Sequence, residues 1–282
     1  MFFGINRCLV LVSVMLLTSC QQAPLAPVKP TREPVVALVL GGGGAKGFAH
    51  IGVIKVLESH GIRPKLVVGT SAGSFVGGLY ASGLSPFALQ QLALNLEESD
   101  VRDLTLSRQG FLLGQKLQDY INVQVNQQPI QNFPIRFAAV ATEADSGRKV
   151  VFTRGSAGQA IRASCSIPNV FVPVTIAGKE YVDGGLVSPI PVETARDLGA
   201  DVVIAVDIST DPEGSPASDT FQILMQTFNI MGKSLNTVLL KDADVVVKPS
   251  LMGVKSADFA ARRRSIEAGR EAMLKQLPRL KE

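Results

Sequence analysis

Two short apolar runs in the N-terminal half of the chain each end in glycines and lead into a helical pattern. The run 35–40 precedes four glycines, and residues 45–60 then place apolar side chains at helical spacing before Gly61. The run 66–68 precedes a tight turn and a second helical stretch, 71–81. Continuously apolar strands are buried on both faces of a parallel sheet, and their alternation with helices defines the α/β class. The sequence therefore predicts a three-layer α/β/α fold around a central, mainly parallel sheet.

Hairpin patterns follow a mainly helical middle region, which we place at 85–128. The apolar stretches 135–142 and 149–153 flank turn residues, and the stretches 170–176 and 180–182 flank another turn. Each pair has the spacing of a β-hairpin. Hairpins add antiparallel neighbours, so we expect the sheet to be mixed.

The first 34 residues are expected to lie outside the folded domain. Arg7 precedes an apolar run, 9–17, that is too short to span a bilayer and is typical of a secretion signal. The run ends in Leu-Thr-Ser-Cys at Cys20, which resembles the lipobox of bacterial lipoproteins. The alternative is an ordinary signal peptide that is cleaved nearby.

The lipobox resemblance implies a division of the chain and a location. Residues 1–19 would be removed as a signal peptide, Cys20 would carry acyl chains such as palmitate, and the proline-rich stretch to residue 34 would act as a tether. The folded domain would then occupy 35–282. Gln21 resembles the residue found in lipoproteins that are sorted to the outer membrane. We therefore expect a lipid-anchored protein of the cell envelope, on the outer membrane and facing the periplasm.

The composition argues for a packed domain and against several other classes. Apolar residues make up 46% of the chain and charged residues 18%, so a large core is available. The net charge of +4 is mild, and basic residues cluster only at Arg262–Arg264, so we expect no nucleic-acid partner. After removal of Cys8 and acylation of Cys20, Cys165 alone remains, and no intramolecular disulfide can form. No ligand spacing indicates a metal, and no cofactor is expected.

The turn after the second apolar run fits the G-x-S-x-G nucleophile elbow, and its setting between a strand and a helix is the context that the motif requires. Ser71 is the candidate nucleophile, and the following helix would direct its N-terminus at developing negative charge. The alternative is a serine that only caps the helix. The elbow residues around the serine are Gly69, Thr70, Ala72 and Gly73.

The glycine run 41–44, followed by Ala45, Lys46 and Gly47, offers closely spaced backbone amides. It can form an oxyanion hole or a phosphate cradle. Gly42, Gly44 and Gly47 satisfy a dinucleotide fingerprint, but the second strand lacks the acid that would bind a ribose. A Walker A loop is excluded because Lys46 precedes Gly47 instead of following it.

A serine nucleophile needs a base, and the histidines available are His50 and His60. Both precede the serine, against the chain order of α/β-hydrolases. Asp183 is the better candidate because it ends an apparent strand beside two glycines, which we expect to leave room for a substrate. The alternative is an aspartate that only stabilises a turn.

The glycine loop, the serine pentad and the Asp183-Gly184-Gly185 triplet, in this order, closely resemble the patatin-like phospholipase family. The resemblance covers about 36–206, including the block 161–174 (IRASCSIPNVFVPV). It implies a Ser71–Asp183 dyad without histidine, an oxyanion hole made by the amides of Gly42, Gly43 and Gly44, and a phospholipid, lysophospholipid or other acyl-ester substrate. The rival interpretations are a non-catalytic envelope lipoprotein with the same fold and a nucleotide-binding enzyme.

Two further patterns near the C-terminus are less specific. An apolar stripe at helical spacing is typical of core, although it could also form an acyl-chain groove or a lid. Arg262–Arg264 are expected to form a solvated basic face, with anionic headgroups as the alternative partner. The stripe comprises Phe221, Leu224, Met225, Phe228, Met231, Leu235 and Leu239.

Overall fold

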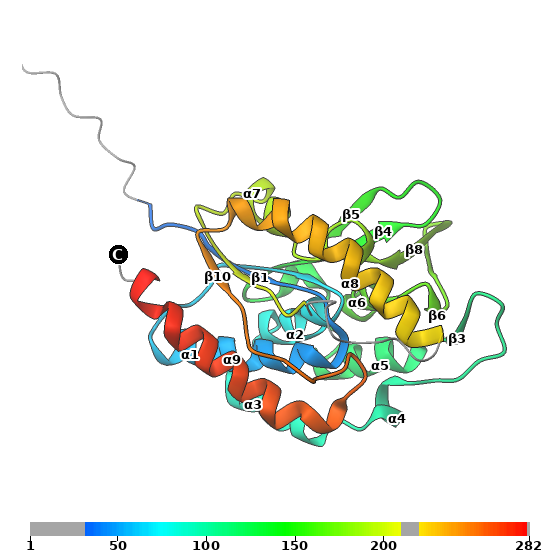
Figure 1. Cartoon of the computed structure of the whole chain (residues 1–282). Helices are drawn as coiled ribbons and strands as arrows, with labels where there is room; N and C mark the ends of the chain where they lie inside the picture. Colours follow the sequence, from blue (N-terminus) through cyan, green and yellow to red (C-terminus); the bar gives the residue numbers. More distant parts are fainter. Residues whose placement is uncertain (1–31, 210–219, 281–282) are drawn as a thin grey trace, which may run out of the picture. The chain divides into compact units, whose positions relative to one another are not determined.

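The computed structural model describes residues 32–209 and 220–280, and residues 34–282 belong to one compact unit. The predicted signal peptide, Cys20 and most of the tether lie outside the described residues. Eight strands form one sheet in the order β10-β9-β1-β2-β4-β8-β7, with β5 paired to β4 (Figure 1). These strands are β1 (Val36–Leu40), β2 (Leu66–Thr70), β4 (Arg136–Glu143), β5 (Lys149–Phe152), β7 (Val174–Ile176), β8 (Lys179–Asp183), β9 (Val202–Val206) and β10 (Val245–Val247).

The sheet is mixed, as the sequence predicts. Strands β10, β9, β1, β2 and β4 run parallel, whereas β5 and β8 run antiparallel to β4 and β7 runs antiparallel to β8. The register places Leu40 beside Gly69, and Thr70 beside Val140. One residue further along β4, Ala141 lies beside Asp183. The glycine loop, the serine turn and the aspartate therefore meet across three neighbouring strand pairs.

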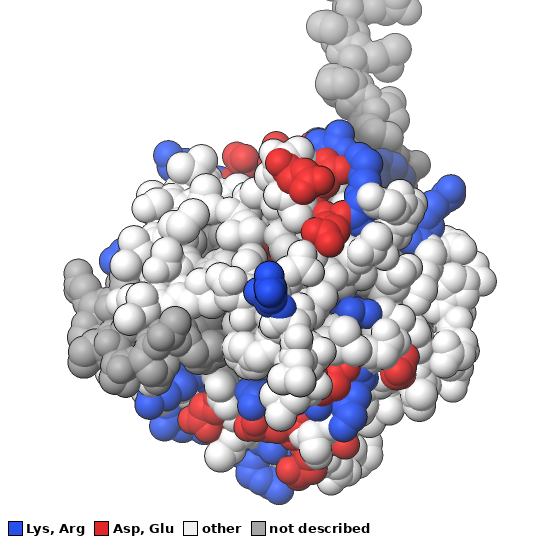
Figure 2. All heavy atoms as spheres, turned by 90° about the vertical axis from the view of Figure 1, so that its right-hand side faces the viewer, with Lys and Arg blue, Asp and Glu red and all other residues white. Residues whose placement is uncertain are grey.

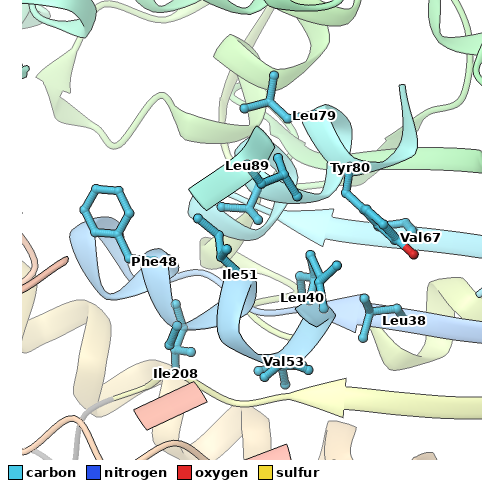
Figure 3. Close-up of a cluster of buried hydrophobic side chains, with 14 of the residues drawn as sticks. Leu38, Leu40, Phe48, Ile51, Val53, Val67, Leu79, Tyr80, Leu89 and Ile208 are labelled. Carbon is cyan, nitrogen blue, oxygen red and sulfur yellow. The ribbon is translucent and has the colours of Figure 1, made fainter. Parts of the chain in front are cut away.

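Apolar residues cover both faces of the sheet, which explains why the strands are continuously apolar. Along β1, Leu38 and Leu40 face one cluster, and Ala37 and Val39 face the other. All four are fully buried. Figure 3 shows the first cluster, where Leu40 lies with Ile51 and other side chains from the helices. Two helical layers thus enclose the sheet, and the predicted three-layer fold is confirmed.

The two layers contain different numbers of helices (Figure 1). The layer over Leu38 and Leu40 includes helices whose buried side chains build the larger cluster. They are α1 (Phe48–Ser59), α2 (Ala72–Ala81), α3 (Pro86–Asn95), α5 (Gln115–Gln124), α6 (Ala157–Cys165) and α9 (Arg262–Gln276). The opposite layer holds α7 (Val192–Asp197) and α8 (Thr220–Leu239).

The prediction of one continuous strand over 170–176 is wrong. Residues on either side of Pro173 belong to two strands, β6 (Asn169–Phe171) and β7, and β6 pairs in a separate sheet with β3 (Gly110–Leu112). Proline has no amide hydrogen to donate to a ladder, so it marks the break. The middle region is therefore helical only in part, because β3 lies between the short α4 (Glu98–Val101) and α5.

The two less specific patterns also differ from expectation. In α8, Leu224, Phe228, Leu235 and Leu239 are half-buried and Met231 is exposed, so its stripe is not simply core. The side chains of Phe221 and Met225 lie outside the description. Arg263 and Arg264 are exposed, as predicted, but Arg262 is half-buried and donates to the carbonyl oxygens of Ala93, Leu94 and Leu96 at the end of α3. Within 32–209 and 220–280, no helix has the length and hydropathy of a membrane span.

Candidate active site

Ser71 occupies a strained turn between β2 and α2. Its φ of 53° and ψ of −124° lie in a region that side chains rarely adopt, at a cost of roughly 1–3 kcal/mol. The turn requires glycine at both ends of the pentad, because a side chain there would clash with neighbouring backbone. A Cβ on Gly69 would lie 2.4 Å from the Gly73 oxygen, and a Cβ on Gly73 would lie 2.0 Å from the Leu40 oxygen. The first and last glycines of the pentad therefore let α2 approach the sheet closely.

Asp183 ends β8 and is held by three hydrogen bonds, two to its backbone and one to its carboxylate. Its N–H donates to the Ser166 carbonyl at 2.8 Å, and its carbonyl accepts from Thr142 Oγ1 at 2.9 Å. Its Oδ1 accepts the Gly185 N–H at 2.7 Å. The expected role of Gly184 is wrong in detail: a Cβ there would lie 2.2 Å from the Val140 oxygen, so this glycine makes room for backbone instead of substrate.

The Asp183 carboxylate is buried and half satisfied. Asp183 is 3% exposed, and its Oδ2 has no hydrogen-bond partner in the described part of the chain. Burial raises the pKa of Asp183 from 3.8 to about 6, although the nearby Ser71 hydroxyl and the Gly185 N–H favour the charged form. A carboxylate with a pKa near 6 is a better proton acceptor than an ordinary aspartate. The structure thus brings the predicted nucleophile and base together, with one carboxylate oxygen left for the serine.

The glycine loop lies against the serine, but its amides are not equivalent. A Cβ on Gly42 would lie 3.3 Å from the Ser71 Cβ. The Gly42 N–H already donates to the Pro189 carbonyl at 3.0 Å. The amides of Gly43 and Gly44 have no such partner among the described residues. Of the three predicted oxyanion donors, Gly43 and Gly44 are therefore available, whereas Gly42 shapes the loop.

Neither histidine has the position of a base. His50 is fully buried on α1, and its Nε2 lies 2.9 Å from the Gly41 carbonyl oxygen. Burial lowers its pKa to about 4, so its ring is neutral at pH 7 and its Nε2–H donates to that oxygen. His60 contacts Ser59 and the Val56 carbonyl at the end of the helix. His50 therefore supports the glycine loop.

The sequence analysis missed Ser164, which holds the backbone of the Ser71 turn. This residue on α6 is fully buried, and its Oγ accepts the Ser71 N–H at 2.9 Å while donating to the Val140 carbonyl at 2.6 Å. One hydroxyl thus links the serine turn to β4. Ser164 lies within the block 161–174, whose resemblance to the family points to this segment. The resemblance does not indicate which side chain of the block contacts the serine turn. Its neighbour Cys165 is buried, and burial raises the pKa of the thiol.

A cavity of about 650 Å³ opens at Ser71 and is walled mostly by apolar side chains. Its size is ordinary for a site that binds a small molecule or a lipid chain. Phe48, Ile51 and Leu89 belong both to the apolar cluster of Figure 3 and to the cavity wall. The cavity is therefore an extension of the core, suited to a long apolar group whose reactive end lies at Ser71.

The geometry of the glycine loop also weighs against a phosphate cradle. Lys46 is 1% exposed, and burial lowers its pKa to about 8 against the opposing charge of Asp207. The Lys46 side chain is therefore directed into the protein, away from a phosphate that the loop could bind.

Among the described residues no group of three or more His, Cys, Asp or Glu side chains could hold a metal.

Comparison with known proteins identifies the family. The patatin-like phospholipase family matches residues 38–196, more than half of the 282-residue chain. The chain belongs to this family. The match begins in β1 and includes the glycine loop, the serine turn and Asp183. The resemblance seen in the sequence is thus confirmed.

Individual relatives agree with this assignment. An uncharacterised NTE family protein of Mycobacterium bovis is 38% identical over 195 residues, which are 68% of this chain and 54% of the relative. Lysophospholipase NTE1 of Debaryomyces hansenii is 32% identical over 218 residues, 73% of this chain but 14% of that protein. The chain therefore spans about half of the first relative and a small part of the second. The crystal structure of VipD from Legionella pneumophila shares the fold, with a TM-score of 0.64, 16% identity and coverage of 88% of this chain and 67% of VipD.

Proposed function

We propose that the chain hydrolyses acyl esters of phospholipids or lysophospholipids with a Ser71–Asp183 dyad. The observation that carries the proposal is the buried, unpartnered Oδ2 of Asp183 beside a serine on a strained elbow. The family assignment supports a lipid ester hydrolase, and a relative named lysophospholipase supports the choice of substrate. The apolar cavity at Ser71 suits an acyl chain.

The reaction follows from the positions of these groups. Ser71 Oγ attacks the ester carbonyl carbon while its proton passes to Asp183 Oδ2. The amides of Gly43 and Gly44 and the N-terminus of α2 stabilise the oxyanion. The alcohol leaves with the proton from Asp183. A water then attacks the acyl carbon while its proton passes to the same carboxylate. The bond from the acyl carbon to Ser71 Oγ breaks as Asp183 returns that proton to the serine oxygen, and the fatty acid leaves.

Labelling with a fluorophosphonate tests this proposal. We expect the native chain to be labelled, Ser71→Ala to be unlabelled, and Asp183→Asn to react slower by a factor of about 10² to 10⁴. Ser82→Ala is the matched control, because its hydroxyl only donates to the Leu79 carbonyl and lies outside the site. Equal labelling of Ser71→Ala and the native chain would refute the nucleophile. Unchanged labelling of Asp183→Asn would refute the base alone.

Two rival functions make different predictions. A non-catalytic lipoprotein with this fold would show neither labelling nor ester turnover. A nucleotide-binding enzyme would gain thermal stability on addition of a dinucleotide, which we do not expect because Lys46 is buried and no acid ends β2.

We further propose that Cys20 carries the acyl anchor and holds the protein at the outer membrane of the cell envelope, facing the periplasm. The lipobox-like tetrad and Gln21 support this proposal. Globomycin should cause a mobility shift in the native chain that is absent in Cys20→Ser. A shift that persists in Cys20→Ser, or no shift in either, would refute it.

A further inference from the structure

The segment between α4 and α5 forms a two-stranded ribbon, here called the rim ribbon and defined as residues 103–113. The Thr105 N–H donates to the Phe111 carbonyl at 2.9 Å, and the Leu113 N–H donates to the Asp103 carbonyl at 2.8 Å. Arg162 on α6 donates to the Leu113 carbonyl at 2.8 Å. The ribbon is therefore ordered by its own ladder and fixed at its base to α6. It includes β3, which also pairs with β6, and projects at the right of Figure 1.

The rim ribbon presents large apolar side chains to solvent. Leu104 is 85% exposed, Leu106 is fully exposed, and Phe111 and Leu113 are 46% and 41% exposed. These positions follow the two-residue period of a strand, and the intervening Leu112 is buried. Leu104 lies opposite the buried Leu112 across the ribbon, so Leu104 and Leu106 lie on one side of it and Phe111 and Leu113 on the other. Single exposed apolar residues are common, but four on one short ribbon indicate a binding surface.

This apolar surface continues into the catalytic cavity. Leu104, Phe111 and Leu112 line the cavity that contains Ser71. Leu104 and Phe111 are thus exposed to solvent and also form part of the wall of the candidate active site, whereas Leu112 is buried. An acyl chain that leaves a bilayer at the ribbon would therefore meet apolar side chains that also line the cavity at Ser71. Continuity with the cavity favours lipid over another partner.

The charge around the ribbon suits lipid headgroups. Residues 104–115 contain no acidic side chain, and Arg108 is exposed at the tip. Asp103 at the base is occupied, since its two oxygens accept the N–H groups of Gly114 and Lys116 at 2.6 and 2.9 Å. Figure 2 views this side of the molecule, and most of its central area carries neither acidic nor basic side chains. An apolar surface with a basic side chain at its tip suits a membrane interface.

We propose that the rim ribbon inserts its apolar side chains into the surface of a lipid bilayer and aligns the mouth of the cavity with the membrane. This inference rests on the proposed function for its purpose, but the insertion can be measured separately from hydrolysis. It is also separate from Cys20, because an acyl anchor holds the protein near the membrane without orienting the cavity.

The absence of tryptophan from the sequence allows a direct test. Leu106→Trp in the full chain carrying Ser71→Ala places a single fluorophore at the tip of the ribbon, and the Ser71 change keeps the lipid intact. Vesicles of phosphatidylcholine and phosphatidylglycerol with brominated acyl chains should quench this tryptophan and shift its emission to the blue. Val238→Trp on α8, at a position 63% exposed, is the matched control and should not respond. Equal responses from the two probes, or none from Leu106→Trp, would overturn the proposal.

Activity gives an independent measurement. Leu106→Ser combined with Leu113→Ser removes two apolar side chains that do not line the cavity. We expect turnover of vesicle phospholipid to fall by about thirty-fold, equivalent to about 2 kcal/mol, and turnover of a soluble short-chain ester to stay within about two-fold. An equal loss on both substrates would overturn membrane docking. Sedimentation of the native chain and the double variant tests self-association. A native dimer that the two substitutions convert to a monomer would also overturn docking, because it would assign the ribbon to a contact between two copies of the chain. Quenching of the Leu106→Trp probe, together with no hydrolysis of either substrate by the native chain, would refute the proposed function and support docking.

Discussion

The burial of Asp183 should make the native protein less stable as the pH rises, and Asp183→Asn should remove this effect. The carboxylate is 3% exposed, and its pKa rises from 3.8 to about 6 because burial penalises the charge. Asparagine has nearly the same shape, can still accept the Gly185 N–H through its oxygen, and does not ionise. The substitution therefore changes charge with little change in packing.

The sign of the effect follows from the direction of the shift. The folded state binds the Asp183 proton more tightly than the unfolded state, so its contribution to stability is complete below pH 4 and is lost as the pH rises through 6. A shift of about two pKa units at about 1.4 kcal/mol each gives a loss of about 3 kcal/mol by pH 7. Asp183→Asn should be more stable than the native chain by up to this amount at pH 7, and the difference should vanish near pH 4.

Urea unfolding at several pH values between 4 and 7.5 measures this difference. Asp207→Asn is a matched control, because Asp207 is also 3% exposed but accepts the Ser209 N–H at 2.9 Å and lies 3.4 Å from Lys248 Nζ. Removing that paired charge should not stabilise the protein at pH 7. A difference between Asp183→Asn and the native chain that is constant from pH 4 to 7 would refute the reasoning.

Three further predictions concern activity and folding. The kcat/KM for a soluble ester should rise with pH through a single limb near pH 6, because Asp183 must be charged to accept a proton; a flat profile would contradict this. Ser164→Ala should lower kcat by about ten-fold with little change in KM and destabilise the fold by about 1–3 kcal/mol, because the Ser71 N–H loses its acceptor. Kinetics with denaturant unfolding would show this, and an unchanged kcat would exclude the positioning role. Gly73→Ala should lower stability by at least about 3 kcal/mol in thermal unfolding, because its Cβ would lie 2.0 Å from the Leu40 oxygen; a near-native Tm would contradict the steric argument.

The features predicted well from the sequence are those set by local patterns. The runs that became β1 and β2 are continuously apolar because helices cover both faces of the sheet. Ser71 was found because its glycines are required by contacts within one short turn. The two histidines were set aside by chain order, and the structure gives both of them local contacts away from the dyad.

The features missed depend on contacts between distant segments. Ser164 accepts a hydrogen bond from the Ser71 N–H, although the two residues are 93 positions apart in the chain. No local sequence pattern indicates that contact. The Gly42 amide is occupied by the Pro189 carbonyl, which only the folded chain brings near. Pro173 marks in the sequence the break between β6 and β7, but no local pattern indicates that β6 pairs with β3. Periodicity identifies which face of an element is buried, whereas long-range pairing determines which polar groups remain free.

The mixed character of the sheet explains how Asp183 comes close to the Ser71 turn. Thr70 pairs with Val140 in β4, and the next residue of β4, Ala141, pairs with Asp183 in the antiparallel β8. The serine turn and the aspartate are thus two strand spacings apart, about 10 Å between backbones. The side chains of a serine and an aspartate can approach each other across this distance, but little room remains for an imidazole between them. The antiparallel β8 therefore brings the carboxylate of the proposed base to the serine turn directly from the sheet.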